Sequence, residues 1–478
     1  MSAAPCSASV LAVFQLVFSP RWIHHWQRRQ ERAGPTDAGV KKNLRGFYER
    51  VFSLHITLWY LIFQRLNDDR TLSAVIKDLR AGGADRLAPR RRKLSRRARS
   101  PRTSAYNQAR QRLPLALLQA ALTHLAAALA RMAGGEPSGR TAPKPQLRMR
   151  QLLDGSTLAM LRTPDLAKEF SPGKNQRGNS GWCLLRIVVG FCAKTGAVFS
   201  AICGAQEHSE QAMAWSLMEH ADAFTVWIGD ANFGVWSIVA QADRFHQDVL
   251  VRLSPSRMRR LCAGQPLSSG QERWITWKPT RADKVPPGTE QKPVAGRLIY
   301  VRIQRDQRWI DLWLFTTLPS RDYPIELLVR WYGQRWQAEL NFRYVKTQLK
   351  LDVLHVGTAA MARKEFYAGL LAYSLVRAVM WEAGERLEQP QAVISFSEAR
   401  RLVISRLKDW GRALCTGCLG LAIWLRALCH EVALHPLPKR RKQRPNEPRR
   451  VRHRRHKFPP LRGTRAAARA RYATTKSL

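Results

Sequence analysis

The sequence predicts an α/β protein in which a mixed sheet is flanked by helices and interrupted by a β-rich insertion. Residues 40 to about 135 carry helical apolar patterns, short apolar and β-branched runs follow from Arg148, and helical patterns return at Pro324. In chain order we expect a helical N-terminal domain (1–146), the first part of the core (147–254), the β-rich insertion (255–323), the second part of the core with C-terminal helices (324–427) and a basic tail (428–478).

The N-terminal part is predicted to be helical and to bind DNA. The stretches "FYERVFSLHITLWYLIFQRL" and "TLSAVIKDLRAGG" have helical apolar spacing, and the second ends on a glycine stop signal. The Arg-rich, Pro-broken stretch "RLAPRRRKLSRRARSPR" follows, and it is either a solvated loop or an arm that contacts phosphates. The tail is basic and almost free of core residues, which predicts a segment that is disordered until it binds.

The charge of the chain indicates a polyanionic partner. The 478 residues include 80 Lys and Arg against 35 Asp and Glu, which gives a formal net charge of +45 and a pI of about 11.2. Such an excess disfavours compaction unless a polyanion neutralises it, and nucleic acid is the obvious polyanion. A coding bias can also raise the Arg content, so the net charge is the stronger indication. We expect a nucleic acid as the partner.

The eight cysteines do not indicate a disulfide framework in a chain of this length. "CTGC" (Cys415, Cys418) with Cys429 and His430 could be read as a zinc ligand set, but the second pair lacks metal-ligand spacing and lies in an apolar helical pattern. The N-terminal apolar run lacks the features of a signal peptide, and polar residues interrupt the apolar run that ends at Gly134. We therefore expect a cytoplasmic protein without a membrane span.

Two of the predicted core strands carry an aspartate. Asp154 interrupts the apolar run "QLLDGSTL", and Asp230 ends the apolar run "VWIGD". An aspartate at a strand end is commonly a turn former or a helix N-cap, and for Asp230 this alternative stays open. The two aspartates become a candidate site only in combination with a third carboxylate.

The predicted insertion has a different pattern from the core. The stretches "RWITWKPT", "RLIYVRIQ" and "RWIDLWLFTTLPS" are alternating and aromatic-rich, and Gly- and Pro-rich turns separate them. This pattern predicts a small antiparallel β unit.

The third carboxylate, Glu339, lies in the stretch "WYGQRWQAELNFRYVK". On one regular α-helix, Tyr332, Arg335, Glu339 and Lys346 would fall within about 60° of one another and form a single stripe. The alternative is a solvated helix face with an i,i+4 pair between Arg335 and Glu339, which contributes about 0.2–0.5 kcal/mol.

Three carboxylates from separate segments are the donor set that a Mg²⁺ site needs. Mg²⁺ prefers oxygen ligands and is commonly held by a few carboxylates together with substrate phosphate. Two such ions about 3.5–4 Å apart activate a water or a 3′-hydroxyl and stabilise the leaving oxygen of a phosphodiester. In this arrangement Arg335 and Lys346 could hold phosphates beside Glu339, and Tyr332 could contact the backbone or stack on a base.

Three motifs together resemble the DDE transposases of bacterial insertion sequences, in the subgroup with the Tyr-Arg-Glu-Lys signature. They are Asp154-Gly-Ser-Thr, Asp230-x-x-Phe-Gly, and Tyr332-x2-Arg335-x3-Glu339-x6-Lys346, whose internal spacing matches without a gap. "SAYNQARQRLP", "KEFYAGLLAYSLVR" and the basic tail are also similar to this family, so the resemblance covers roughly residues 50–465. Ser374 stands where relatives often carry Asn.

The resemblance implies an RNase H-like catalytic core interrupted by a β insertion. Asp154, Asp230 and Glu339 would be the catalytic residues and the ligands of two Mg²⁺ ions, for which Mn²⁺ can substitute. The signature residues Tyr332, Arg335 and Lys346 would bind the transposon end.

A family tryptophan that stacks on a flipped base corresponds to Trp313. A core tryptophan is the alternative reading, because Trp309 lies in the same segment.

The family works as a homodimer on paired terminal inverted repeats and inserts into target DNA, through strand cleavage, a hairpin intermediate and strand transfer. A cut-and-paste transposase of an insertion sequence is the leading interpretation. The alternatives are a non-catalytic, decayed or domesticated DNA-binding protein, and a related metal-dependent DNA nuclease.

Overall fold

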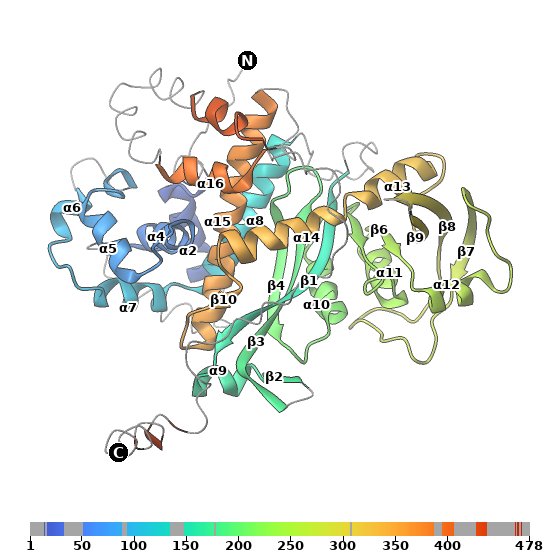
Figure 1. Cartoon of the computed structure of the whole chain (residues 1–478), viewed down its shortest axis with the longest axis horizontal. Helices are drawn as coiled ribbons and strands as arrows, with labels where there is room; N and C mark the ends of the chain where they lie inside the picture. The colour runs from blue at the N-terminus through green and yellow to red at the C-terminus, as the bar shows by residue number, and fades with distance from the viewer. Residues whose placement is uncertain are drawn as a thin grey trace.

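The computed structural model describes residues 14, 17–32, 51–87, 93–133, 148–175, 178–305, 308–386, 394–405, 427–436, 464, 466–467 and 470. Helices from the N-terminal part lie on one side, a large mixed sheet occupies the middle, and further strands extend this sheet on the other side (Figure 1). The predicted α/β class is confirmed. The pair Cys415 and Cys418, and most of the predicted tail, lie outside the described residues.

The sheet has ten strands, with β2-β3-β1-β5-β6-β9-β8-β7 as its main path, while β10 pairs with β1 and β4 with β3. The strands are β1 (Arg150–Leu161), β2 (Pro172–Asn175), β3 (Gly178–Cys192), β4 (Val198–Ala205), β5 (Val226–Gly229), β6 (Asp248–Arg252), β7 (Gln271–Trp277), β8 (Val294–Arg305), β9 (Arg308–Thr316) and β10 (Val353–Leu354). β1, β5 and β6 are parallel to one another, whereas β3, β4 and the β7–β9 group are antiparallel to their neighbours.

Helices cover both faces of this sheet. The N-terminal helices are α2 (Pro20–Arg32), α4 (Leu54–Leu66), α5 (Leu72–Arg80), α6 (Leu94–Arg97), α7 (Ser104–Arg112) and α8 (Leu115–Met132), with a short 3₁₀ turn η2 (Asp85–Leu87). The core helices are α9 (Pro164–Glu169), α10 (Glu210–Glu219), α11 (Trp236–Arg244), α12 (Pro255–Cys262), α13 (Ile325–Gly333), α14 (Trp336–Arg343), α15 (Ala359–Arg386) and α16 (Phe396–Ser405). The long helix α15 packs against α4, α8 and β4, which joins the N-terminal helices to the sheet.

Alternation along β1 divides the core in two, because successive side chains of a strand point to opposite faces. Leu152 and Leu158 belong to a large cluster that includes residues of α14, α15 and the N-terminal helices. Leu153 belongs to a second cluster, built around α10 and α11. Asp154 shares the face of Leu152 and Leu158, so its side chain points toward the side covered by α14.

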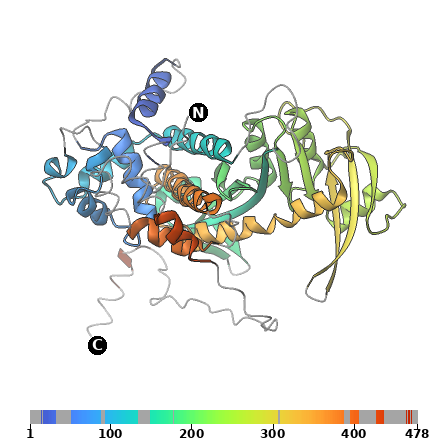
Figure 2. The same ribbon diagram turned by 90° about the horizontal axis from the view of Figure 1, so that it is seen from above.

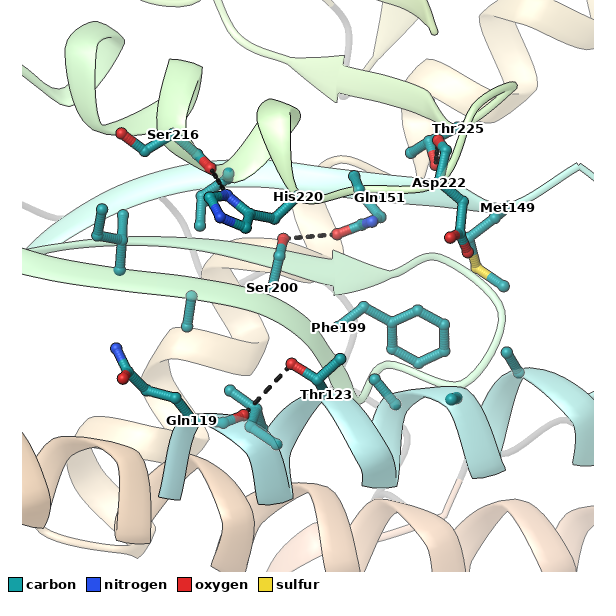
Figure 3. Close-up of a pocket in the computed structure, with 18 of the residues that line it drawn as sticks. Gln119, Thr123, Met149, Gln151, Phe199, Ser200, Ser216, His220, Asp222 and Thr225 are labelled. Atoms are coloured by element: carbon teal, nitrogen blue, oxygen red, sulfur yellow. Dashed lines mark hydrogen bonds between the residues drawn. The ribbon is translucent and has the colours of Figure 1, made fainter. Parts of the chain in front are cut away.

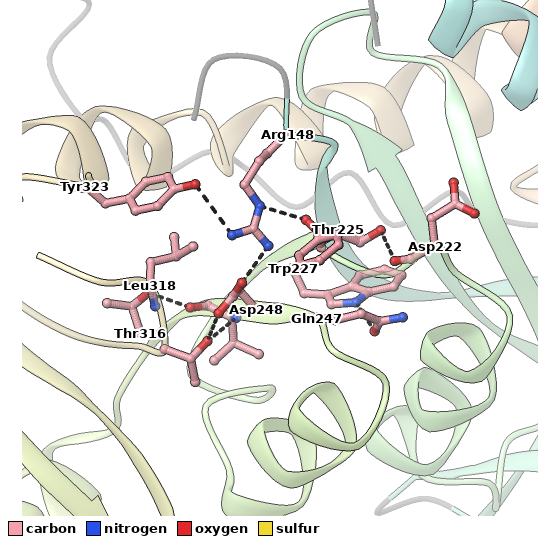
Figure 4. A network of polar contacts seen from close by, with 12 residues as sticks. Arg148, Asp222, Thr225, Trp227, Gln247, Asp248, Thr316, Leu318 and Tyr323 are labelled. Carbon is pink, nitrogen blue, oxygen red and sulfur yellow. Dashed lines mark hydrogen bonds and ion pairs between the residues drawn. The ribbon is translucent and has the colours of Figure 1, made fainter. Parts of the chain in front are cut away.

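A polar network ties the strands together at the end of the sheet where β5 and β6 begin (Figure 4). Arg148 donates to the carbonyl of Phe224 at 2.8 Å and forms an ion pair with Asp248 at 2.5 Å. Thr317 donates to the other carboxylate oxygen of Asp248 at 2.5 Å, so the pair also includes the residue that follows β9. Buried charge-assisted contacts of this kind fix the register of β5, β6 and β9.

The strands predicted for the insertion are β7, β8 and β9, and they are antiparallel as expected. They do not form a separate sheet, because β9 pairs with β6 from Leu250↔Thr316 to Arg252↔Leu314. The far part of the β8–β9 hairpin projects beyond the core (Figure 2).

The stretch from Trp331 to Lys346 is not one regular α-helix, so this prediction is wrong. The helix α13 ends at Gly333, and the backbone N–H groups of Gln334 and Arg335 donate to carbonyls three residues earlier. Gly333 lowers the local helix propensity at this break. A π-helical segment η4 (Tyr344–Gln348) then follows α14, and it turns Lys346 relative to Glu339.

No single helix among the described segments is long and apolar enough to cross a membrane, although the pair Ser104–Arg112 and Leu115–Arg131, bent by 73°, passes by length and composition.

Candidate active site

The three predicted carboxylates approach one another beside the C-terminal end of β5, where the longer strand β1 continues past it. Leu153 of β1 pairs with Gly229 of β5. Asp154 and Asp230 are the next residues, so they lie at the same level on neighbouring strands, whose spacing is about 4.8 Å. Glu339 comes from α14, which packs over β1.

Asp154 is half-buried, and its pKa records the neighbouring charges. Burial raises the pKa of the Asp154 carboxyl to about 6, against the effect of the Gly155 backbone N–H, which donates to it at 2.9 Å. The carboxylates of Asp230 and Glu339 raise this pKa further. The site therefore gathers negative charge around Asp154.

Asp230 follows β5 directly and also forms a turn. Its Oδ1 accepts a hydrogen bond from the backbone N–H of Asn232 at 2.9 Å, which is the turn-forming alternative left open by the sequence. Gly234, in the same motif, allows close approach to β6, because a Cβ there would lie 2.0 Å from the carbonyl oxygen of Arg252. The motif thus shapes a tight turn that holds Asp230 at the C-terminal end of β5.

Glu339 forms an ion pair with Arg335 at 2.7 Å, the i,i+4 pair anticipated from the sequence. Burial alone would lower the pKa of Arg335, but its hydrogen bond to Glu339 raises that pKa overall. The Glu339 side chain is 40% exposed. One oxygen of Glu339 is therefore engaged with Arg335 in this conformation.

The other two signature residues also face this region. Burial raises the pKa of Tyr332, and the charges of Arg335 and Asp230 both act on it. Lys346 donates to the hydroxyl of Ser156, two residues after Asp154, at 2.5 Å. Although the stripe is broken, all four signature residues remain beside Asp154 or Asp230.

The donor set fits a divalent cation by its chemistry, because it consists of carboxylates whose mutual repulsion a cation would relieve. Within the segments that the structure describes, no three Asp, Glu, His or Cys side chains stand close enough together to hold a metal ion as they are. In this conformation Glu339 is paired with Arg335 instead.

Trp313 lies on β9, near the same level of the sheet. Its carbonyl accepts from the N–H of Leu253, just after β6, and its ring stacks on Tyr300 with centroids 4.2 Å apart. It also packs against the second hydrophobic cluster. Trp309, four residues earlier on the same face, is 63% exposed, so the geometry leaves the choice between the two rings open.

The surroundings of Gly155 are not evident from the sequence. A Cβ at Gly155 would lie 2.4 Å from the carboxyl carbon of Glu210, the first residue of α10. The carboxylate of Glu210 accepts from the Asn232 side chain at 2.9 Å, and burial and Asp230 raise its pKa. The available signal was the glycine after Asp154 together with an acidic residue at a helix start, which is too common a pattern to be decisive.

A cavity of about 500 Å³ lies elsewhere, between α8 and the strand β4, and is shown in Figure 3. Its wall includes the Ser200 hydroxyl, which donates to Gln151 at 2.7 Å, and apolar residues of α8. None of the predicted site residues lines it. The cavity and the candidate active site are therefore separate places on the sheet.

Part of the chain is similar to a known protein family. Residues 145–375, just under half of the chain, match the family model described as the transposase DDE domain. The matched segment runs from the start of β1 into α15 and contains all three predicted carboxylates. Fold and match together support a DDE-type transposase domain with a mixed sheet.

The chain is also similar to transposases of Escherichia coli insertion sequences. It is 38% identical over 63 residues to the transposase for insertion sequence element IS421 and, equally, to the InsL protein of element IS186A from strain K12, which is named as a transposase. The similar segment is 13% of this chain and spans 17% of the length of these relatives.

Proposed function

We propose that the protein is a cut-and-paste transposase of the Tyr-Arg-Glu-Lys subgroup, with Asp154, Asp230 and Glu339 as its catalytic residues. The observation that carries this proposal is the approach of three carboxylates, from β1, from the turn after β5 and from α14, inside the segment that matches the transposase DDE domain. Arg335 and Lys346 stand beside them.

The three carboxylates would hold two Mg²⁺ ions, or Mn²⁺ in their place, which supply activation of the attacking water or 3′-hydroxyl and stabilisation of the leaving oxygen. Asp154 and Asp230 contribute from the rigid sheet. Glu339 exchanges part of its ion pair with Arg335 for this role, and Arg335 is then free to bind a phosphate of the DNA.

The partner in this proposal is double-stranded DNA, first the terminal inverted repeats and then the target. Lys346 and Arg335 contact phosphates, Tyr332 contacts the backbone or a base, and Trp313 stacks on a base during a hairpin step. The net charge of +45 favours such a partner. A homodimer on paired ends, a soluble cytoplasmic setting and the RNase H-like domain organisation belong to the same proposal.

The test is a cleavage assay on a linear fragment that carries the ends of the element, with Mg²⁺ or with EDTA. Wild type should release the ends only with the metal, and Glu339→Gln, Asp154→Asn and Asp230→Asn should each bind the ends without cutting. Glu326→Gln is the matched control, because Glu326 is exposed in the first turn of α13. Cleavage by the wild type in EDTA, or cleavage by any of the three variants with the metal, would refute the assignment.

A second candidate, a DNA-binding protein without cleavage activity, is favoured by one observation, the engagement of Glu339 with Arg335. In that case the pair would simply stabilise α14. End binding without metal-dependent cutting in wild type would support this candidate.

A further inference from the structure

We propose that Glu210 is a positioning residue of the candidate active site, which holds the turn of Asp230 through Asn232. This inference rests on the proposed function, because it concerns the same carboxylate site.

The first step is the chain of hydrogen bonds from α10 to Asp230. The Asn232 side-chain nitrogen donates to Glu210 Oε2 at 2.9 Å, while the backbone N–H of Asn232 donates to Asp230 Oδ1 at 2.9 Å. Gln211, the next residue of α10, donates to the carbonyl of Asn232 at 2.8 Å. Asn232 is thus held from both sides, and the orientation of the Asp230 carboxylate follows from it.

The second step is the space that Gly155 provides. A side chain at position 155 would point to the face of the sheet opposite Asp154. The Glu210 carboxylate occupies the volume that such a side chain would fill. A Cβ would come within 2.5 Å of Glu210 Oε2, the oxygen that accepts from Asn232. The glycine directly after Asp154 therefore admits Glu210 beneath the strand.

The alternative role for Glu210 is electrostatic, since an acid in the first turn of a helix interacts favourably with the helix dipole. Arg186 at 4.0 Å also offers a partial ion pair. Neither of these roles requires Gly155 or Asn232, so the two explanations make different predictions.

The experiment measures binding of Mn²⁺ alone to the full chain, by electron paramagnetic resonance of free Mn²⁺. Glu210→Ala should weaken Mn²⁺ binding about 10–100-fold, as is typical when a group that orients a metal ligand is removed. Glu210→Gln should stay within about threefold of wild type, because its amide oxygen still accepts from Asn232. Glu219→Ala, at the exposed end of the same helix, is the control and should bind like wild type.

A second variant displaces the Glu210 carboxylate without changing Glu210 itself. Gly155→Ala should displace the carboxylate and weaken Mn²⁺ binding as Glu210→Ala does, and combining both substitutions should add no further loss. Melting temperatures of all variants are measured alongside, so that loss of fold is recognised.

Unchanged Mn²⁺ binding in Glu210→Ala, or a loss in Glu210→Gln equal to that in Glu210→Ala, overturns the positioning role. The proposed function still stands in that case if the wild type binds Mn²⁺ and cleaves. Absence of Mn²⁺ binding and of cleavage in wild type overturns both.

Discussion

The pKa of Asp154 leads to a prediction about stability in the absence of metal. The carboxyl is harder to ionise in the folded chain than in the unfolded chain, so the folded state binds more protons between the ordinary value of 3.8 and about 6. The stabilisation by the protonated form is fully present below 3.8 and is lost as the pH rises through about 6. Asp154→Asn removes this dependence, because the amide does not titrate.

The magnitude follows from the two pKa values. One pH unit corresponds to about 1.36 kcal/mol, so the interval from 3.8 to about 6 corresponds to about 3 kcal/mol. This value is an upper limit, because the side chain is only half-buried and water screens part of the effect. For a chain of 478 residues, an unfolding entropy of about 2.1 cal/mol/K per residue means that 1 kcal/mol changes the melting temperature by about 1 °C. The melting temperature of Asp154→Asn relative to wild type should therefore rise by up to about 3 °C between pH 4 and pH 7.5.

The assay is differential scanning calorimetry of both proteins in EDTA over this pH range. Because both chains carry the same large positive charge, its general effect on stability cancels in the comparison. Two melting curves that run parallel with pH would refute the reasoning, since they would mean that Asp154 ionises as easily in the folded as in the unfolded state.

Three further predictions concern DNA contacts and packing. Lys346→Ala should reduce the slope of log K against log salt for end binding by about 0.9, since one phosphate contact fewer releases fewer counterions, and an unchanged slope in a binding titration would count against the contact. Trp313→Ala should slow the release of hairpin-sealed ends in a gel assay more than it weakens end binding, and the same defect in Trp309→Ala instead would transfer the stacking role to Trp309. Glu365→Gln should destabilise the chain by about 3–5 kcal/mol, because it leaves two buried arginines without their counter-charge. The loss is measured as a lower melting temperature, and a variant that melts like wild type would show that these buried ion pairs are not stabilising.

The sequence was sufficient to predict the fold class, the succession of strands and helices along the chain and the candidate pair Asp154 and Asp230, because alternation and strand ends are local signals. The prediction of one continuous helix from Trp331 to Lys346 was wrong, because helical periodicity alone assumes a regular α-helix. The turn at Gln334 and the π-helical segment leave no trace in the spacing of the residues along the sequence.

Glu210 could not be found from the sequence. Its contact with Gly155 depends on which helix packs beneath β1, and its hydrogen bond to Asn232 depends on the turn after β5. Such contacts join segments far apart in the chain, and no periodicity records them.

The position of Glu365 on α15 has a consequence for how this chain can be divided. Its carboxylate is completely buried between Arg65 of α4, at 2.6 Å, and Arg110 of α7, at 3.2 Å. Cutting the chain at the start of the matched domain would remove both arginines and would also expose to water the apolar residues of α15 that now pack against the N-terminal helices. The N-terminal helices thus share a core with the matched domain, and an excised catalytic fragment should need them, supplied separately, to remain folded.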